Sequence, residues 1–135
     1  MAAAARDYFV RLTELAQSFL DQVSLNRLDL NPERAIWEVH GSIGEYQLRL
    51  KEIFNQSGRL YSYYVIKVGV VVVGFDNYPD RRALREKYGQ NFSMHLSELI
   101  PHKHGPRKEL LELTEEITLE TFLDYLNQKN YLQKF

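Results

Sequence analysis

Residues 35–54, AIWEVHGSIGEYQLRLKEIF, decide the fold class, because apolar and polar side chains alternate along them with a period of two. Trp37 and Val39 alternate with Glu38 and His40, and the alternation resumes after a glycine turn. Successive side chains of a β-strand point to opposite faces of its sheet, so this pattern is typical of strands with one buried face. The segment predicts a two-stranded antiparallel hairpin.

The alternation continues beyond this hairpin and predicts an antiparallel meander of four to five strands. Turn-forming residues 55–58 and Gly69 separate the segments, and short turns of this kind join antiparallel neighbours. Residues 25–32, which precede the hairpin, are either a short strand or an extended linker. The four expected strands lie at residues 35–43, 45–54, 59–68 and 70–75.

Segments with helical periodicity precede and follow the predicted sheet in the sequence. Residues 7–23 carry an apolar stripe at helical spacing, which indicates an amphipathic helix. A charged helix is expected at residues 80–88, ending at a glycine, and another at residues 118–128 with Thr118 as its N-cap. We therefore expect one α+β domain over residues 1–135, in which an N-terminal helix and C-terminal helices pack against the sheet.

The composition is that of a globular protein, and it excludes several kinds of site. Of the 135 residues, 44% are apolar and 26% are charged, and the formal net charge is -1. With so little net charge, any affinity for nucleic acid must come from a local patch. The absence of cysteine excludes disulfides, thiolate catalysis and cysteine-ligated zinc. No segment approaches the roughly 20 apolar residues of a membrane span, so we expect a cytoplasmic protein without a membrane partner.

Two short motifs are the candidates for chemistry. The apolar run at residues 70–75 stops abruptly at Asp76 and Asn77, and the segment Pro101-His102-Lys103-His104 follows later. Polar side chains at the end of a buried element are held firmly by the scaffold while their polar atoms stay accessible. The alternative interpretation is a turn at the first motif and a surface loop at the second.

His102 and His104 are two residues apart, so an extended backbone would place both imidazoles on one face. Such a pair can act as general acid and general base on a phosphodiester, because the ordinary histidine pKa lies near neutral pH. Alternatively, the pair and Asp76 can bind a divalent metal ion such as zinc, iron or manganese. Lys103 would lie on the opposite face and serve either chemistry less directly.

Arg59, Tyr61 and Tyr63 are candidate binding residues. If they share an exposed face, the rings can stack on bases while the guanidinium holds phosphates. Aromatic packing within the sheet is the alternative explanation for the two tyrosines.

Three motifs together resemble the TumE family, the toxin components of bacterial and archaeal toxin–antitoxin pairs. Residues 58–64 resemble the family's Tyr-Ser-Tyr-like strand, residues 73–79 its Asp-Asn-x-Pro turn, and residues 101–104 its histidine-rich segment. The resemblance covers residues 34–128. The chain departs from the pattern at Gly74, where the family has arginine, and at Asp80, where it has histidine.

The resemblance implies a toxin-like cytoplasmic protein that acts on RNA as a metal-independent ribonuclease. His102 and His104 would be the catalytic acid–base pair, with Asp76 orienting one imidazole. Asn77 would hold the turn or a phosphate oxygen, and Arg59 or Lys103 would neutralise charge. The implied partner is a small antitoxin, and a homodimer is compatible with the pattern. The alternative is a non-catalytic protein-interaction module, or a module that binds a divalent metal.

Overall fold

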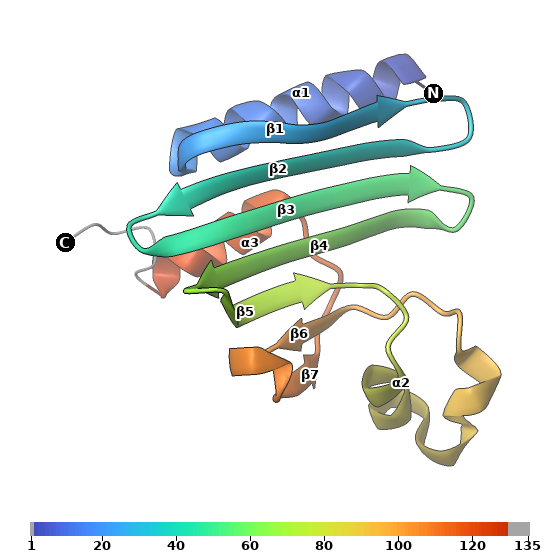
Figure 1. Cartoon of the computed structure of the whole chain (residues 1–135). Helices are drawn as coiled ribbons and strands as arrows, with labels where there is room; N and C mark the ends of the chain where they lie inside the picture. Colours follow the sequence, from blue (N-terminus) through green and yellow to red (C-terminus); the bar gives the residue numbers. More distant parts are fainter. Residues whose placement is uncertain (1, 130–135) are drawn as a thin grey trace.

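The computed structural model describes residues 2–129 and has the expected α+β architecture (Figure 1). Two long helices, α1 (Ala2–Phe19) and α3 (Leu119–Gln128), pack against a seven-stranded sheet. A shorter helix, α2 (Arg81–Tyr88), leads into the 3₁₀-helix η1 (Gly89–His95), and a second 3₁₀-helix, η2 (Pro106–Lys108), follows β6. The strands are β1 (Asp21–Leu30), β2 (Ala35–Ile43), β3 (Tyr46–Asn55), β4 (Gly58–Lys67), β5 (Val70–Asp76), β6 (His102–His104) and β7 (Leu111–Leu113).

The sheet is a meander in which the spatial order of the strands equals their order in the chain. All neighbouring pairs are antiparallel. The four strands predicted from alternation are confirmed as β2 to β5, and residues 25–32 belong largely to a fifth strand, β1. The sheet is larger than the predicted four to five strands because β6 and β7 span only three residues each, too few to show alternation.

Helix α1 begins earlier and ends earlier than the predicted range 7–23. It ends at Phe19, and β1 begins at Asp21; the second residue of the strand, Gln22, has a φ of +51°. Val23 therefore lies in the strand, although it packs against the same core as α1. Its burial explains why an apolar residue at this position continued the helical stripe in the sequence.

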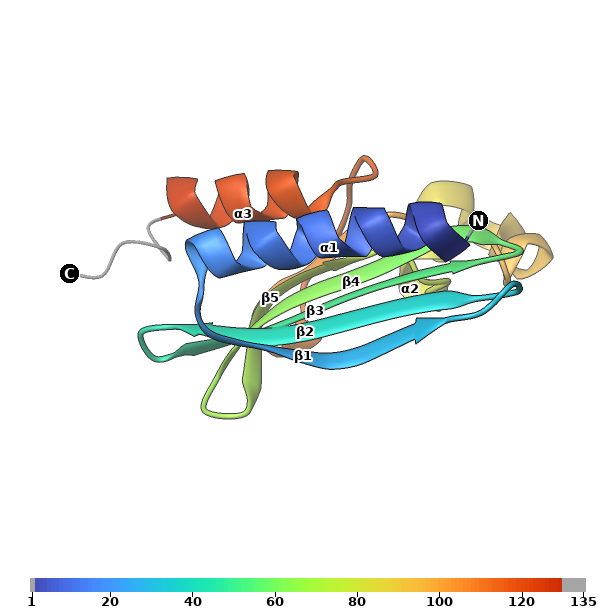
Figure 2. The ribbon, with the colours of Figure 1, turned by 90° about the horizontal axis from the view of Figure 1, so that it is seen from above.

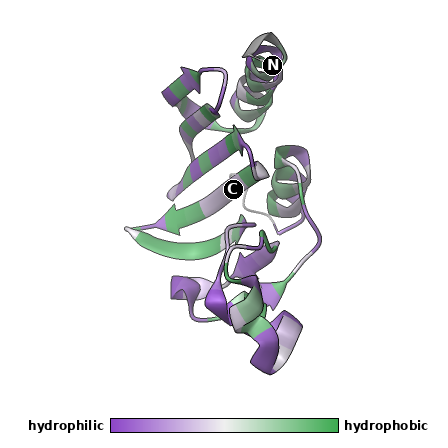
Figure 3. Ribbon diagram, turned by 90° about the vertical axis from the view of Figure 1, so that its right-hand side faces the viewer, coloured by the Kyte–Doolittle hydropathy of each residue, from purple (hydrophilic) through white to green (hydrophobic). Residues whose placement is uncertain are grey.

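Both long helices cover one face of the sheet, and the opposite face carries no long helix (Figure 2). The covered face supplies the main core, in which Trp37, Leu50 and Tyr63 of the sheet lie with Phe9 of α1 and Phe122 of α3. Figure 3 shows the alternation of hydropathy as purple and green bands along the strands. Of the helices within residues 2–129, none has both the length and the apolar character that a bilayer crossing requires.

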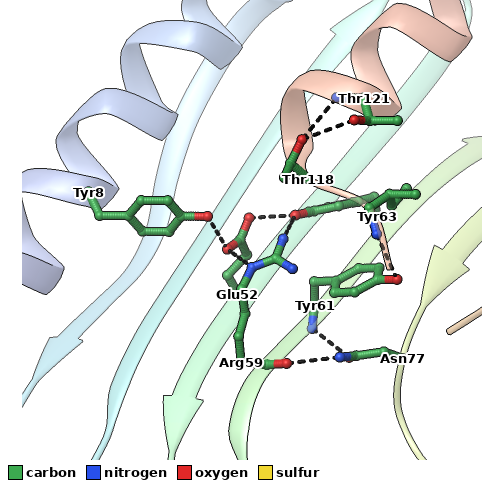
Figure 4. Close-up of polar contacts among 9 residues, drawn as sticks. Tyr8, Glu52, Arg59, Tyr61, Tyr63, Asn77, Thr118 and Thr121 are labelled. Atoms are coloured by element: carbon green, nitrogen blue, oxygen red, sulfur yellow. Dashed lines mark hydrogen bonds and ion pairs between the residues drawn. The ribbon is translucent and has the colours of Figure 1, made fainter. Parts of the chain in front are cut away.

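A buried carboxylate connects α1 to the sheet (Figure 4). The fully buried Glu52 accepts hydrogen bonds from the hydroxyls of Tyr8 (2.6 Å) and Tyr63 (2.5 Å), and Arg59 Nε donates to it at 2.9 Å. Burial, together with the Glu52 charge, raises the pKa of both tyrosines well above its ordinary value. Burying a carboxylate costs free energy unless hydrogen bonds and a cation compensate its charge. Arg59 and Tyr63 provide these contacts, so their role is to stabilise the core.

The prediction that Tyr61 and Tyr63 lie on an exposed binding face is wrong. Both rings are fully buried and stack on each other with centroids 5.2 Å apart. The register pairs them with Glu52 and Leu50 of β3, on the face that α3 covers. Burial raises the pKa of Tyr61 to about 12. The alternative interpretation, aromatic packing within the sheet, is confirmed.

The Glu52 contacts predict a graded loss of stability. Tyr8→Phe removes one hydrogen bond and should lower the free energy of unfolding by about 1 kcal/mol. Glu52→Gln removes the charge that compensates Arg59 and should cost about 3 kcal/mol. Urea unfolding followed by circular dichroism measures both changes.

Tyr125→Phe is the matched control, because its ring packs edge-on against Phe75 and its hydroxyl has no hydrogen-bond partner within residues 2–129. A cost for Glu52→Gln no larger than that of the control would show that this carboxylate does not hold α1 on the sheet.

Candidate functional site

Antiparallel pairing of β5 with β6 brings the two candidate motifs together. The register places Asp76 opposite His102 and Gly74 opposite His104. The predicted convergence of the carboxylate and the two imidazoles is therefore confirmed. The three side chains lie on the sheet face that the long helices leave uncovered, and they are nonetheless buried, with 6%, 1% and 5% of their surface exposed.

Both imidazoles are directed at the same carboxylate. His102 Nε2 lies 3.2 Å from Asp76 Oδ1, and His104 Nε2 lies 3.5 Å from Asp76 Oδ2. The two rings are nearly perpendicular, with centroids 4.7 Å apart. One nitrogen from each ring and one carboxylate oxygen all lie within 4.8 Å of one another. Such a compact arrangement suits ligands of one small cation better than two rings placed on either side of a phosphate.

The main chain fixes the orientation of His102. Its Nδ1 lies 2.5 Å from the carbonyl oxygen of Ile100, which can only accept a hydrogen bond, so Nδ1 carries a proton. In the neutral ring the lone pair of Nε2 then points at the Asp76 carboxylate, which is also an acceptor. Two acceptors at this distance repel each other unless a cation, either a proton or a metal ion, lies between them.

Asp76 is held in place by two further donors. The Tyr64 hydroxyl donates to Oδ2 at 2.5 Å, and the Tyr78 backbone N–H donates to Oδ1 at 3.0 Å. Burial and the nearby Asp76 charge raise the pKa of Tyr64, which keeps its hydroxyl protonated. The Tyr64 ring crosses directly over Gly74, where a Cβ atom would lie 2.1 Å from ring carbon Cε1. Glycine at this position therefore permits the Tyr64–Asp76 contact.

The Asn77 side chain bonds to the backbone of β4 (Figure 4). Its side chain accepts from the Tyr61 N–H at 2.9 Å and donates to the Arg59 carbonyl at 2.8 Å. Its own carbonyl accepts from the Ile100 N–H at 3.0 Å. Of its two predicted roles the structure supports the holding of the turn, and Asn77 also anchors the residue that orients His102.

The remaining predicted binding residues lie away from the carboxylate and the imidazoles. Lys103 points to the opposite face, as predicted for an extended segment, and its Nζ lies 5.1 Å from the Tyr125 ring centroid. Arg59, Tyr61 and Tyr63 belong to the helix-covered side described above. The prediction that Arg59 or Lys103 neutralises charge at the site is therefore wrong.

A cleft of about 500 Å³ opens over the three buried side chains. Sequence reasoning missed Lys51 and Ser62, because their positions in the cleft follow from strand register and not from a motif. Asp80 was noted only as a departure from a family pattern; it caps α2, and its Oδ2 lies 3.9 Å from His102 Nε2. The lining residues beyond the two motifs are Lys51, Ser62, Tyr64, Asp80, Arg82 and Lys108.

Positive charge surrounds this cleft. Arg82 donates to the Lys108 and Glu109 carbonyls at 2.9 and 3.0 Å, which fixes the guanidinium beside η2. The Lys108 ammonium lies 4.7 Å from the centroid of the Tyr64 ring. Lys51 enters from β3 on the other side. The cleft therefore suits an anionic ligand.

His104 is a neutral base in this setting. Burial, followed by the neighbouring His102 charge, lowers its pKa below the ordinary value. Its Nδ1 is the buried side-chain polar atom that lacks a hydrogen-bond partner within the part of the chain that the structure describes. A neutral imidazole is the form that accepts a proton or binds a metal ion.

The other two histidines do not join the cluster. His95 stacks on Tyr88 in the α2–η1 region, with centroids 3.6 Å apart. His40 contacts Glu38 at 3.0 Å on β2, further along the uncovered face.

No protein-family model, curated protein or solved structure matches the chain.

The packing of Tyr64 on Gly74 predicts a strong energetic coupling. Gly74→Ala should lower the free energy of unfolding by about 1–3 kcal/mol, because its methyl group displaces the ring. In a Tyr64→Ala background the same change should cost much less, with a coupling of about 1 kcal/mol or more. A double-mutant cycle by urea unfolding measures this. Additive effects would mean that glycine is not required for the Tyr64 position.

Proposed function

We propose that Asp76, His102 and His104 bind a divalent transition-metal ion, and that the surrounding cleft hydrolyses phosphodiester bonds in RNA. The observation that carries this proposal is the convergence of two imidazole nitrogens and one carboxylate, with His102 Nδ1 held by a backbone carbonyl. That arrangement leaves two acceptors face to face, and a metal ion is the cation that would satisfy all three ligands at once.

The surroundings of the ligands are those of a metal site. Metal-binding histidines commonly donate their second ring N–H to a carbonyl, and binding carboxylates accept supporting hydrogen bonds. Ile100 and Tyr64 provide these contacts. A set of two histidines and one carboxylate suits zinc, iron or manganese. Asp76, His102 and His104 would hold the ion, which would supply a water-derived nucleophile at neutral pH and polarise a phosphoryl oxygen.

The charges of the cleft favour a phosphate substrate. Lys51, Arg82 and Lys108 approach from three different elements, so they can contact several oxygens of one phosphodiester. Tyr64 and Tyr78 hold Asp76, and Asn77 anchors Ile100, so these residues position the ligands.

The resemblance to the TumE family supports a more specific biological role. A toxin that degrades RNA would act in the cytoplasm and would require a small antitoxin partner. The free edges of the sheet, β1 and β7, are the surfaces where such a partner, or a second copy of the chain, can add a strand.

A histidine pair acting without metal is the second candidate, and the contact of Asp76 with both imidazoles favours it. One protonated ring would then provide the cation and serve as general acid, while the other serves as base. The alternative of a protein-interaction module would require Tyr61 and Tyr63 to be exposed, and the structure does not support it because both rings are buried.

The metal proposal predicts stoichiometric binding that depends on all three ligands. Wild-type protein titrated with Zn²⁺ or Mn²⁺ by isothermal calorimetry should bind one ion. Asp76→Asn, His102→Ala and His104→Ala should each weaken binding by more than the roughly 10–100-fold cost of losing a supporting hydrogen-bond partner. His40→Ala and His95→Ala are the controls and should bind as the wild type does. Equal binding by the ligand variants and the controls would refute the site.

The catalytic proposal predicts metal-dependent cleavage of RNA. A labelled oligoribonucleotide should be cut by the wild type, spared in EDTA and cut again after Mn²⁺ or Zn²⁺ is restored. His102→Ala and His104→Ala should be inactive in vitro, and their expression should not arrest growth. Cleavage that persists in EDTA yet requires both histidines would replace the metal mechanism with the acid–base pair. Growth arrest by all variants would remove the histidines from the toxic activity.

A further inference from the structure

Two adjoining hollows form one trough across the uncovered face of the sheet. The cleft over Asp76 and the histidines has a volume of about 500 Å³, and a second cavity of about 250 Å³ lies beside it. The second cavity extends toward Glu38 and Arg49. Both are lined by the same four residues, Lys51, Ser62, Tyr64 and Lys108.

The strand register explains the direction of this trough. One row of paired residues crosses five strands, and a second row runs beside it with Tyr64 and Arg49 at its centre. Neighbouring strands are roughly 4.8 Å apart, so each row spans about 19 Å. The first row is His102, Asp76, Ser62, Lys51 and Glu38, and the second is His104, Gly74, Tyr64, Arg49 and His40.

Cationic and acidic side chains are unevenly distributed along the two rows. Beyond Asp76, the next charged side chains are Lys51 and Arg49 on β3, with Lys108 above Tyr64. The carboxylate at the far end, Glu38, lies beside His40 at 3.0 Å. Within the described residues, the second cavity is lined by three cations and by one carboxylate, Glu38, at its far end. Hydroxyl, aromatic and apolar side chains complete its lining.

We propose that this trough binds a single strand of RNA, whose scissile phosphate lies over Asp76 and whose neighbouring phosphates lie along Lys51 and Arg49. The inference rests on the proposed function and specifies its substrate as an extended strand longer than a dinucleotide. The second cavity continues the cleft along the sheet and is lined by three cations, so successive phosphates of one extended strand can lie along both. Phosphate contacts from a basic groove bind single strands with little dependence on sequence.

The test measures RNA binding along the trough separately from RNA cleavage in the cleft. Arg49→Ala and wild type are compared for binding a fluorescent 12-nucleotide single strand in EDTA by anisotropy, and for cleaving a dinucleotide with Mn²⁺ present. Arg49 lines the second cavity and not the cleft. The variant should bind the 12-mer several-fold more weakly, and the slope of log affinity against log salt should fall by about 0.7. Its kcat/KM for the dinucleotide should stay within about twofold, since a dinucleotide extends little beyond the cleft.

Arg11→Ala is the matched control, because it removes one exposed charge from α1 on the other side of the sheet. It should change neither measurement. Unchanged 12-mer binding by the trough variant, or tighter wild-type binding to a 12-base-pair duplex, would overturn the inference. If wild type cleaves neither substrate while the predicted loss of binding is seen, the proposed hydrolysis fails and the trough stands.

Discussion

Antiparallel pairing between β5 and β6 is the constraint on which the site depends. It sets Asp76 opposite His102 and Gly74 opposite His104, so residues distant in the sequence become immediate neighbours. Because strand side chains alternate between faces, the same register sends Lys103 and Phe75 to the other side of the sheet. A shift of one residue would exchange the two sets and dismantle the ligand cluster.

The rest of the molecule maintains this register and leaves one face accessible. The side chain of Asn77 bonds to the backbone of β4, and its backbone carbonyl accepts from the segment before β6, so one residue connects three neighbouring parts of the sheet. Helices α1 and α3 pack on the opposite face, and the Glu52 contacts fix α1 there. The main apolar core is thereby concentrated on one side of the sheet, while Asp76, His102 and His104 are buried on the other.

The sequence allowed prediction of the fold class and of the three central side chains, because alternation and the two motifs are local signals. It could not place the tyrosines of β4, since Tyr61 and Tyr63 alternate with Ser62 and Tyr64 and both sets contain polar atoms. Only the packing of α3 decides which set is buried. Strands of three residues and lining groups such as Lys51 and Ser62 depend on strand register, for which one sequence has no signal.

The central proposal is that Asp76 and the two imidazoles bind a metal ion between them. Anomalous diffraction at the cobalt absorption edge, from crystals grown with Co²⁺, tests this claim most directly. The account predicts one strong peak about 2.0–2.2 Å from a nitrogen of each of His102 and His104 and from an Asp76 oxygen. Absence of a peak at this position with Co²⁺ in excess, or a peak only at His40 or His95, would contradict it.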